Sequence, residues 1–194
     1  MPRAIVLISL FLVGLSVEVA FLVRQGRALR GDLDRALQML HATQEELAKA
    51  RANTSLSGIA AEPFQLMTTE GDSIELGAGP SFVVFFSTTC PACNEDAPIW
   101  GDLYRDYSDA GVRFVGVCVK AEDESAQAFA DRWEVDFPVA YTDDPRVSLA
   151  YRADYLPRRI LIDADGLIAW SDRADAPLGV EGEAEVREAL EGLL

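Results

Sequence analysis

A Cys-x-x-Cys pair, Cys90-Pro91-Ala92-Cys93, stands directly between an apolar run and a stretch that can be helical. The apolar run, Phe82 to Phe86, is typical of a central strand that is covered on both faces. A strand that leads into a Cys-x-x-Cys turn and then into a helix is typical of a dithiol that cycles with a disulfide. The sequence therefore predicts an α/β fold in which this turn links a strand to a helix.

The two cysteines are expected to have different roles. Cys90 would face unpaired backbone N–H groups and the positive end of the helix dipole, which favour thiolate over thiol. It is the candidate nucleophile, and Pro91 suits the first helical position because its missing N–H costs nothing there. Cys93 falls one turn further on, close enough to Cys90 to close a small disulfide ring, and is the candidate resolving thiol.

A zinc site and a structural disulfide are the two other interpretations of this pair. Structural zinc usually takes four Cys or His ligands, and the chain offers only Cys118 and the distant His41 besides the pair. No metal or cofactor is therefore expected. A structural disulfide stays open, although so short a ring constrains the unfolded chain little. Cys118 lies in the apolar run 115–119 and is expected to be a buried, inert thiol.

The N-terminal part of the chain is apolar. Residues 5–23 contain Glu18 as their one charged side chain and are long enough to cross a bilayer as a helix. A cleaved signal peptide is the rival interpretation, but no convincing small-x-small cleavage site precedes Arg24. We therefore expect residues 1–4 to be a short tail and residues 5–23 to be a transmembrane signal anchor.

Basic side chains just after this apolar run argue against export of the C-terminal part. Arg24, Arg27 and Arg30 favour a cytoplasmic domain under the positive-inside rule, although large domains are translocated largely regardless of such charges.

The chain has a net charge of −15, and its acidic excess lies in residues 54–194. This charge argues against nucleic acid as a partner.

Residues 24–53 contain no proline and many good helix formers, which predicts a helical spacer. Leu33, Leu40 and Leu47 recur every seven residues, but this coiled-coil seam is too thin to predict more than a weak tendency to dimerise. Residues 53–58 form a polar break, and residues 54–61 are expected to be a linker. Residues 62–194 are expected to form one globular domain.

Strand and helix patterns alternate along this domain and predict a sandwich with a mixed sheet. A hairpin is expected over 64–76. The remaining strands are expected over 82–86, 112–119, 137–141, 159–163 and 167–170, and helices over 94–110, 123–134, 145–151 and 183–194.

The order of these predicted elements and motifs resembles that of the membrane-anchored TlpA/ResA group of thioredoxin-fold thiol-disulfide oxidoreductases. The features that carry the resemblance are the hairpin Phe64 to Leu76, Phe82 to Pro98 with its Cys-Pro-Ala-Cys, the insertion Val119 to Tyr151, and Leu156 to Asp163 followed by Asp165-Gly166. The resemblance covers Glu62 to Leu194. It implies a thioredoxin-like fold, a mixed central sheet flanked by helices, with an N-terminal hairpin and a central insertion, preceded by a transmembrane helix and a helical spacer.

The resemblance also implies residue roles. In that family a cis proline faces the disulfide, and Pro157 holds the matching position. Leu156 and Pro157, together with Pro91, would then form the surface on which a substrate chain docks. Many thioredoxins carry a buried Asp where this chain has Val84. Its role of proton acceptor would pass to Asp96, and the alternative is that Asp96 is a solvated acid that complements the helix dipole.

The activity implied is exchange between Cys90–Cys93 and thiols or disulfides of client proteins in the periplasm. The family leans toward reductants for clients such as apocytochrome c or other secreted cysteine proteins, supplied by a membrane or periplasmic electron donor. A MauD-like role, in which the client is a disulfide-rich enzyme that must mature, is a narrower variant of this activity. Two other classes stay open, a non-catalytic binding module and a peroxiredoxin-like thiol peroxidase. A peroxiredoxin would carry Thr three residues and Pro seven residues before its cysteine, whereas this chain has Ser87 and Val83 there.

Overall fold

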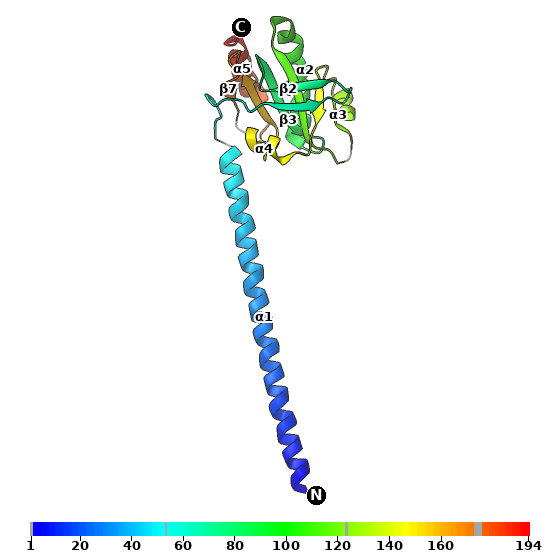
Figure 1. Ribbon diagram of the computed structural model, residues 1–194, viewed down its shortest axis with the longest axis vertical. Helices are drawn as coiled ribbons and strands as arrows, with labels where there is room; N and C mark the ends of the chain where they lie inside the picture. Colours follow the sequence, from blue (N-terminus) through cyan, green and yellow to red (C-terminus); the bar gives the residue numbers. More distant parts are fainter. Residues whose placement is uncertain (1, 53, 123, 173–175) are drawn as a thin grey trace. The chain divides into compact units, whose positions relative to one another are not determined.

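The computed structural model describes residues 2–52, 54–122, 124–172 and 176–194. The chain divides into two compact units, residues 1–47 and 48–194. The first unit is most of one helix, α1 (Pro2–Ala52), whose last residues belong to the second unit. The other described helices and strands lie in the second unit (Figure 1).

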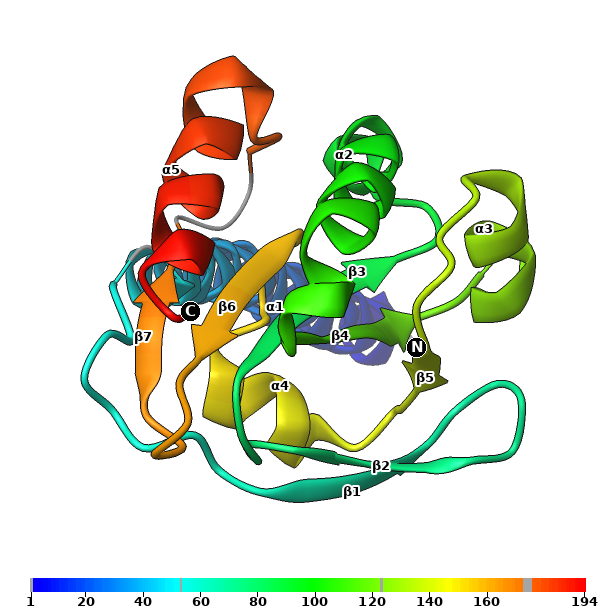
Figure 2. The ribbon, with the colours of Figure 1, turned by 90° about the horizontal axis from the view of Figure 1, so that it is seen from above.

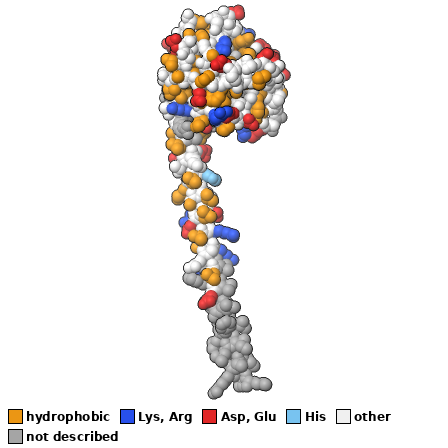
Figure 3. Space-filling view, in the orientation of Figure 1, with side chains coloured by type: hydrophobic (Ala, Val, Ile, Leu, Met, Phe, Trp, Pro, Cys, Tyr) orange, Lys and Arg blue, Asp and Glu red, His pale blue; other side chains and the backbone are white. Residues whose placement is uncertain are grey.

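Helix α1 carries exposed hydrophobic side chains along its described part (Figure 3). Leu29, Leu33 and Leu40 are 72%, 58% and 52% exposed. Among the residues that the structure describes, no helix is both long and apolar enough to cross a membrane. The side chains of residues 1–17, 19–21 and 23 lie outside the described set, so the anchor expected over residues 5–23 stays a prediction.

A five-stranded mixed sheet forms the centre of the second unit, in the order β5-β4-β3-β6-β7. Strand β3 runs parallel to β4 and antiparallel to β6, while β4 pairs parallel with β5 and β6 pairs antiparallel with β7. The bounds are β3 (Ser81–Ser87), β4 (Arg113–Lys120), β5 (Val139–Tyr141), β6 (Arg158–Ile162) and β7 (Ile168–Ser171).

Side chains that alternate along β3 build two hydrophobic layers, one on each face of the sheet. Phe82, Val84 and Phe86 face helices α2 (Pro91–Tyr107), α3 (Ala126–Arg132) and α5 (Gly179–Glu191). Val83 and Phe85 face α4 (Pro145–Tyr151) and the hairpin β1 (Phe64–Met67) and β2 (Ser73–Leu76). Figure 2 shows the two sets of elements on opposite sides of the sheet. A short 3-10 helix, η1 (Ser108–Ala110), follows α2. The predicted α/β fold with a mixed sheet is confirmed.

Several boundaries differ from the sequence prediction, among them helix α5, which spans Gly179–Glu191 and not 183–194. Two of the differences come from capping side chains. Helix α2 begins at Pro91 rather than at Asn94, since the Cys90 sulfur accepts a hydrogen bond from the Cys93 N–H and caps the helix. Helix α3 begins at Ala126 rather than at residue 123, since Ser125 Oγ accepts from the Ala128 N–H at 3.1 Å.

Residues 54–61, expected as a linker, lie against the domain. Leu56 is 2% exposed within the hydrophobic layer that contains Val83 and Phe85, and its N–H donates to Ser171 Oγ at 2.8 Å. The Gly58 N–H donates to the Ile168 carbonyl, and the Ile168 N–H donates to the Ile59 carbonyl, both at 2.8 Å. This segment therefore acts as an edge of the domain beside β7.

Candidate active site

The Cys-x-x-Cys pair lies where β3 ends and α2 begins. Cys90 is the N-cap of α2, with extended backbone dihedrals, and Pro91 follows in the first turn. Cys90 and Cys93 form a disulfide with their Cα atoms 5.2 Å apart. Cys90 is half-buried whereas Cys93 is fully buried, so only the first sulfur can meet a large partner.

The Cys90 sulfur also sits at the positive end of α2. The Cys93 N–H points at it over 3.2 Å, and this N–H is one of the helix donors that lack a partner in the preceding turn. Both effects stabilise negative charge on the sulfur once the disulfide is reduced. The geometry thus fits the expected assignment of Cys90 as nucleophile.

The loop before β6 faces the disulfide. The Leu156–Pro157 peptide bond is cis, and the Leu156 carbonyl oxygen lies 3.5 Å from the Cys90 sulfur. Leu156 is half-buried and Pro157 is buried, while Pro91 is exposed at the start of α2. The structure therefore places Leu156 and Pro91 beside Cys90, whereas Pro157 is buried and supports the loop from inside.

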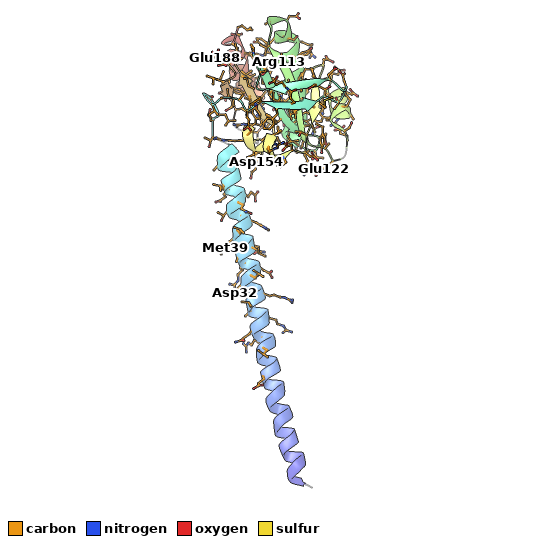
Figure 4. The ribbon with its side chains drawn as sticks, viewed as in Figure 1. Asp32, Met39, Arg113, Glu122, Asp154 and Glu188 are labelled. Carbon is orange, nitrogen blue, oxygen red and sulfur yellow. A yellow bond between two sulfur atoms is a disulfide. The ribbon has the colours of Figure 1, made fainter. Side chains whose placement is uncertain are left out.

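Other polar side chains lie near this end of the domain. Thr89 Oγ1 donates to Glu122 at 3.4 Å, and Glu122 forms an ion pair of 2.6 Å with Lys120. Figure 4 shows Glu122 and Asp154 toward one end of the domain and Arg113 and Glu188 toward the opposite end. Asp154 is exposed and precedes Leu156 by two residues.

Asp96 is fully buried, which corrects the alternative that it is a solvated acid. One carboxylate oxygen forms an ion pair with Arg159, and the other accepts the Leu178 N–H at 2.8 Å. Burial raises the pKa of Asp96 from 3.8 to about 6, against the lowering effect of the Arg159 charge and the Leu178 N–H. Such a carboxyl exchanges a proton near neutral pH, which an exposed Asp does not.

Sequence reasoning missed Arg158 and Arg159, which are 0% and 2% exposed although they open a central strand. Arg159 contacts both Asp96 and Asp172, and its Nη2 donates to the Ala176 carbonyl at 2.8 Å. The sequence signal that could have found them is the pair of arginines in an otherwise apolar strand. Such a pair indicates buried charges with acidic partners, because buried arginines require them.

Cys118 is buried in β4, as the apolar run around it predicted. Burial raises the pKa of its thiol to about 11, so very little thiolate forms near neutral pH. Within the described residues, no group of three or more His, Cys, Asp or Glu side chains is arranged to hold a metal ion.

Comparison with known proteins identifies the family. The family model described as Redoxin matches residues 52–190, and the chain belongs to that family. It is 35% identical over 116 residues to the thiol-disulfide oxidoreductase ResA of Halalkalibacterium halodurans, a match that covers 58% of this chain and 65% of that protein. It is 30% identical over 141 residues to ResA of Bacillus thuringiensis, covering 71% of this chain and 76% of that protein.

Solved structures share the fold. A putative thiol:disulfide interchange protein DsbE from Chlorobium tepidum superimposes with a TM-score of 0.60 at 22% identity, covering 69% of this chain and 97% of that one. A secreted Mycobacterium tuberculosis disulfide oxidoreductase superimposes with a TM-score of 0.57 at 20% identity, covering 74% and 98%. The thioredoxin-like fold is thereby confirmed. The relatives' names and the Cys90–Cys93 pair confirm the predicted class, thiol-disulfide oxidoreductase.

Proposed function

We propose that the protein is a reductant of protein disulfides outside the cytoplasm, tethered by its N-terminal helix. The observation that carries the proposal is the asymmetric pair at the start of α2, with Cys90 half-buried and Cys93 fully buried. A client sulfur can reach Cys90, while Cys93 is placed to attack the mixed disulfide from inside. Relatives named ResA, at 30–35% identity, support the same chemistry.

The proposed reaction has two steps. The Cys90 thiolate attacks one client sulfur, which breaks the client disulfide and forms a Cys90–client disulfide with release of the other client sulfur as thiolate. The Cys93 sulfur, after losing its proton, attacks Cys90, forms the Cys90–Cys93 disulfide and releases the second client thiol. Two electrons pass from the dithiol to the client, so a separate donor on the same side of the membrane must reduce the protein again.

The client would dock against the Leu156 backbone and the exposed Pro91. The Leu156 carbonyl lies 3.5 Å from the Cys90 sulfur, so an extended client segment paired to this backbone would present its cysteine to Cys90. Apocytochrome c and other secreted cysteine proteins are the proposed clients, and a disulfide-rich enzyme, as in the MauD-like variant, is a narrower one.

The proposed location rests on the apolar residues 5–23, which we take as the membrane anchor of an exported domain. Arg24, Arg27 and Arg30 favour the opposite orientation. A membrane-impermeant maleimide added to spheroplasts under reducing conditions should label Cys90. Labelling only after detergent lysis would place the domain in the cytoplasm instead.

Trapping tests the proposed cysteine roles. Cys93→Ser should accumulate Cys90–client disulfides in cells, because attack remains and resolution is lost, whereas Cys90→Ser should trap none. Cys118→Ala is the matched control and should trap no more than the wild-type chain, since Cys118 is buried in β4. Complexes trapped by Cys90→Ser and not by Cys93→Ser would reverse the two roles.

The direction of electron flow is tested by a glutathione titration of the full chain in mild detergent, read by alkylation and mass shift. A midpoint near that of thioredoxin, about −270 mV, supports a reductant, and one near −120 mV indicates an oxidant. The absence of any reversible transition would favour a binding module with a structural disulfide. Consumption of hydrogen peroxide by the reduced chain would favour the thiol peroxidase.

A further inference from the structure

Four buried charged side chains lie behind the active-site disulfide. Asp96 comes from α2, Arg158 and Arg159 from the start of β6, and Asp172 from the residue after β7. Arg158 and Asp96 are 0% exposed, Arg159 is 2% exposed, and the Asp172 side chain is 7% exposed. We call these four residues the buried charge cluster. Its formal charge is zero, as expected of ionised groups that have left water.

Arg159 is the centre of the cluster. Its Nη1 contacts Asp96, its Nε contacts Asp172, and its Nη2 donates to the Ala176 carbonyl at 2.8 Å. Its backbone N–H donates to Asp172 at 3.1 Å as well. A planar guanidinium with donors in fixed directions suits three such acceptors, and a lysine ammonium does not. Asp172 and the Ala176 carbonyl therefore fix the orientation in which Arg159 contacts Asp96.

Asp96 is held in a form that suits a negative charge. Both of its oxygens already accept hydrogen bonds, one from Arg159 and one from the Leu178 N–H. Both hydrogen bonds favour the carboxylate, and each oxygen keeps a second lone pair that can accept a proton. Asp96 also follows Cys93 by three residues in α2, which puts both on one face of the helix.

We propose that Arg159, anchored by Asp172, is a positioning residue that keeps Asp96 ionised one helical turn from Cys93, ready to take the Cys93 proton during resolution. The inference rests on the proposed oxidoreductase function. In the step it assigns, the Cys93 S–H proton moves to Asp96, the Cys93 sulfur bonds to the Cys90 sulfur, and the Cys90–client bond breaks. The client leaves with that bond's electron pair as a thiolate.

The charges that face Asp96 have opposite effects on its proton affinity. Arg159 lowers the pKa of Asp96, while the negative charges of Asp172 and of Glu95 raise it. The Leu178 N–H, just before α5, also contacts Asp96, and Glu185 of α5 lines the adjoining cavity with Arg159. Removing the Arg159 charge and removing the Asp172 charge should therefore shift the protonation of Asp96 in opposite directions. A purely structural ion cluster predicts lower stability in both variants and no such opposition.

The test uses the reduced full chain in mild detergent and Ellman's reagent, whose coloured thiolate is released twice. The first release reports attack by Cys90, and the second reports attack by Cys93 on the mixed disulfide. A Cys118→Ala background restricts the count to the two active-site thiols. Stopped-flow measurement of the second rate from pH 5 to 9 gives the midpoint of its pH profile for each variant.

Arg159→Gln should raise this midpoint by about 1–3 pH units, the range expected when a neighbouring opposite charge is lost. Asp172→Asn keeps an acceptor for Arg159 but loses the charge, and should lower the midpoint. Arg159→Lys keeps the charge but loses the planar set of donors, so it should recover only part of the wild-type profile. Asp96→Asn should abolish the pH step, and adding Arg159→Gln to it should shift nothing further.

Unshifted midpoints in Arg159→Gln and Asp172→Asn, or shifts in the same direction, would overturn the inference while leaving the proposed function intact. Loss of the first release in the wild-type chain would instead count against the proposed function. If Arg159→Gln does not fold, the downward shift in Asp172→Asn decides the matter, because that variant keeps all the donors of Arg159.

Discussion

Leu56 offers a sharp test of where the folded domain begins. Its side chain is 2% exposed in the layer that includes Val83 and Phe85, and its N–H is bonded to Ser171 Oγ at 2.8 Å. Leu56→Ala removes a buried side chain and leaves a cavity, so the free energy of unfolding should fall by about 2–5 kcal/mol. A leucine in a free linker would cost nothing measurable.

Ile59→Ala is the matched control in the same segment. The Ile59 side chain is 46% exposed, whereas its carbonyl still accepts the Ile168 N–H at 2.8 Å. The substitution keeps the backbone contacts and removes an apolar group of equal size, so we expect a loss below about 1 kcal/mol. The difference between the two variants therefore isolates the burial of Leu56.

The measurement is urea unfolding of the full chain, with tryptophan fluorescence as the signal for the domain. A lower midpoint with an unchanged slope would report a change in stability alone. Equal and small losses in Leu56→Ala and Ile59→Ala would refute the packing of residues 54–61. The result also concerns the active site, because Ser171, the partner of Leu56, directly precedes Asp172 of the buried charge cluster.

Two further predictions concern buried titratable groups. Iodoacetamide at pH 7 should modify Cys118 of the native reduced chain at least about 100-fold more slowly than a free thiol, since burial raises its pKa from 9.0 to about 11; comparable rates by mass spectrometry would contradict its burial. Asp96 has a folded pKa of about 6 against 3.8, so the folded state binds its proton more tightly than the unfolded state. Its contribution to stability should thus be present below about pH 4 and decline by ~3 kcal/mol as pH rises to about 6. Urea unfolding of wild type and Asp96→Asn across this range measures that difference, and parallel curves would refute it.

Local patterns were enough to predict the parts of the site that neighbouring residues build. The apolar run before Cys90, the proline after it and the one-turn spacing to Cys93 all act within a few residues, and the strand, turn and helix follow from them. The position of Pro157 came from the resemblance, because no local pattern predicts which loop lies opposite the disulfide.

The environment of Asp96 could not be predicted in this way. Its two partners, Arg159 and the Leu178 N–H, are 63 and 82 residues away in the sequence. Local spacing gave equal weight to a solvated and a buried carboxyl, and the tertiary structure decides for burial. The packing of residues 54–61 was missed for the same reason, since nothing in the segment itself shows that the Leu56 N–H bonds to Ser171 in β7, 115 residues away.

Strand β6 connects the two parts of the proposed reaction. Leu156, whose backbone would dock the client, lies two residues before the strand, and Arg159 is the strand's second residue. Arg159 pairs with Val84 in β3, the strand that leads to Cys90, and its guanidinium contacts Asp96 in the helix that begins at the Cys-x-x-Cys pair. Because β6 is buried over its whole length and bonded to strands on both sides, these groups are held at fixed separations. The charge that positions Asp96 therefore lies on the same rigid element as the proposed docking edge. Strand β6 thus holds in place both the backbone that would dock the client and the arginine that would position the proton acceptor.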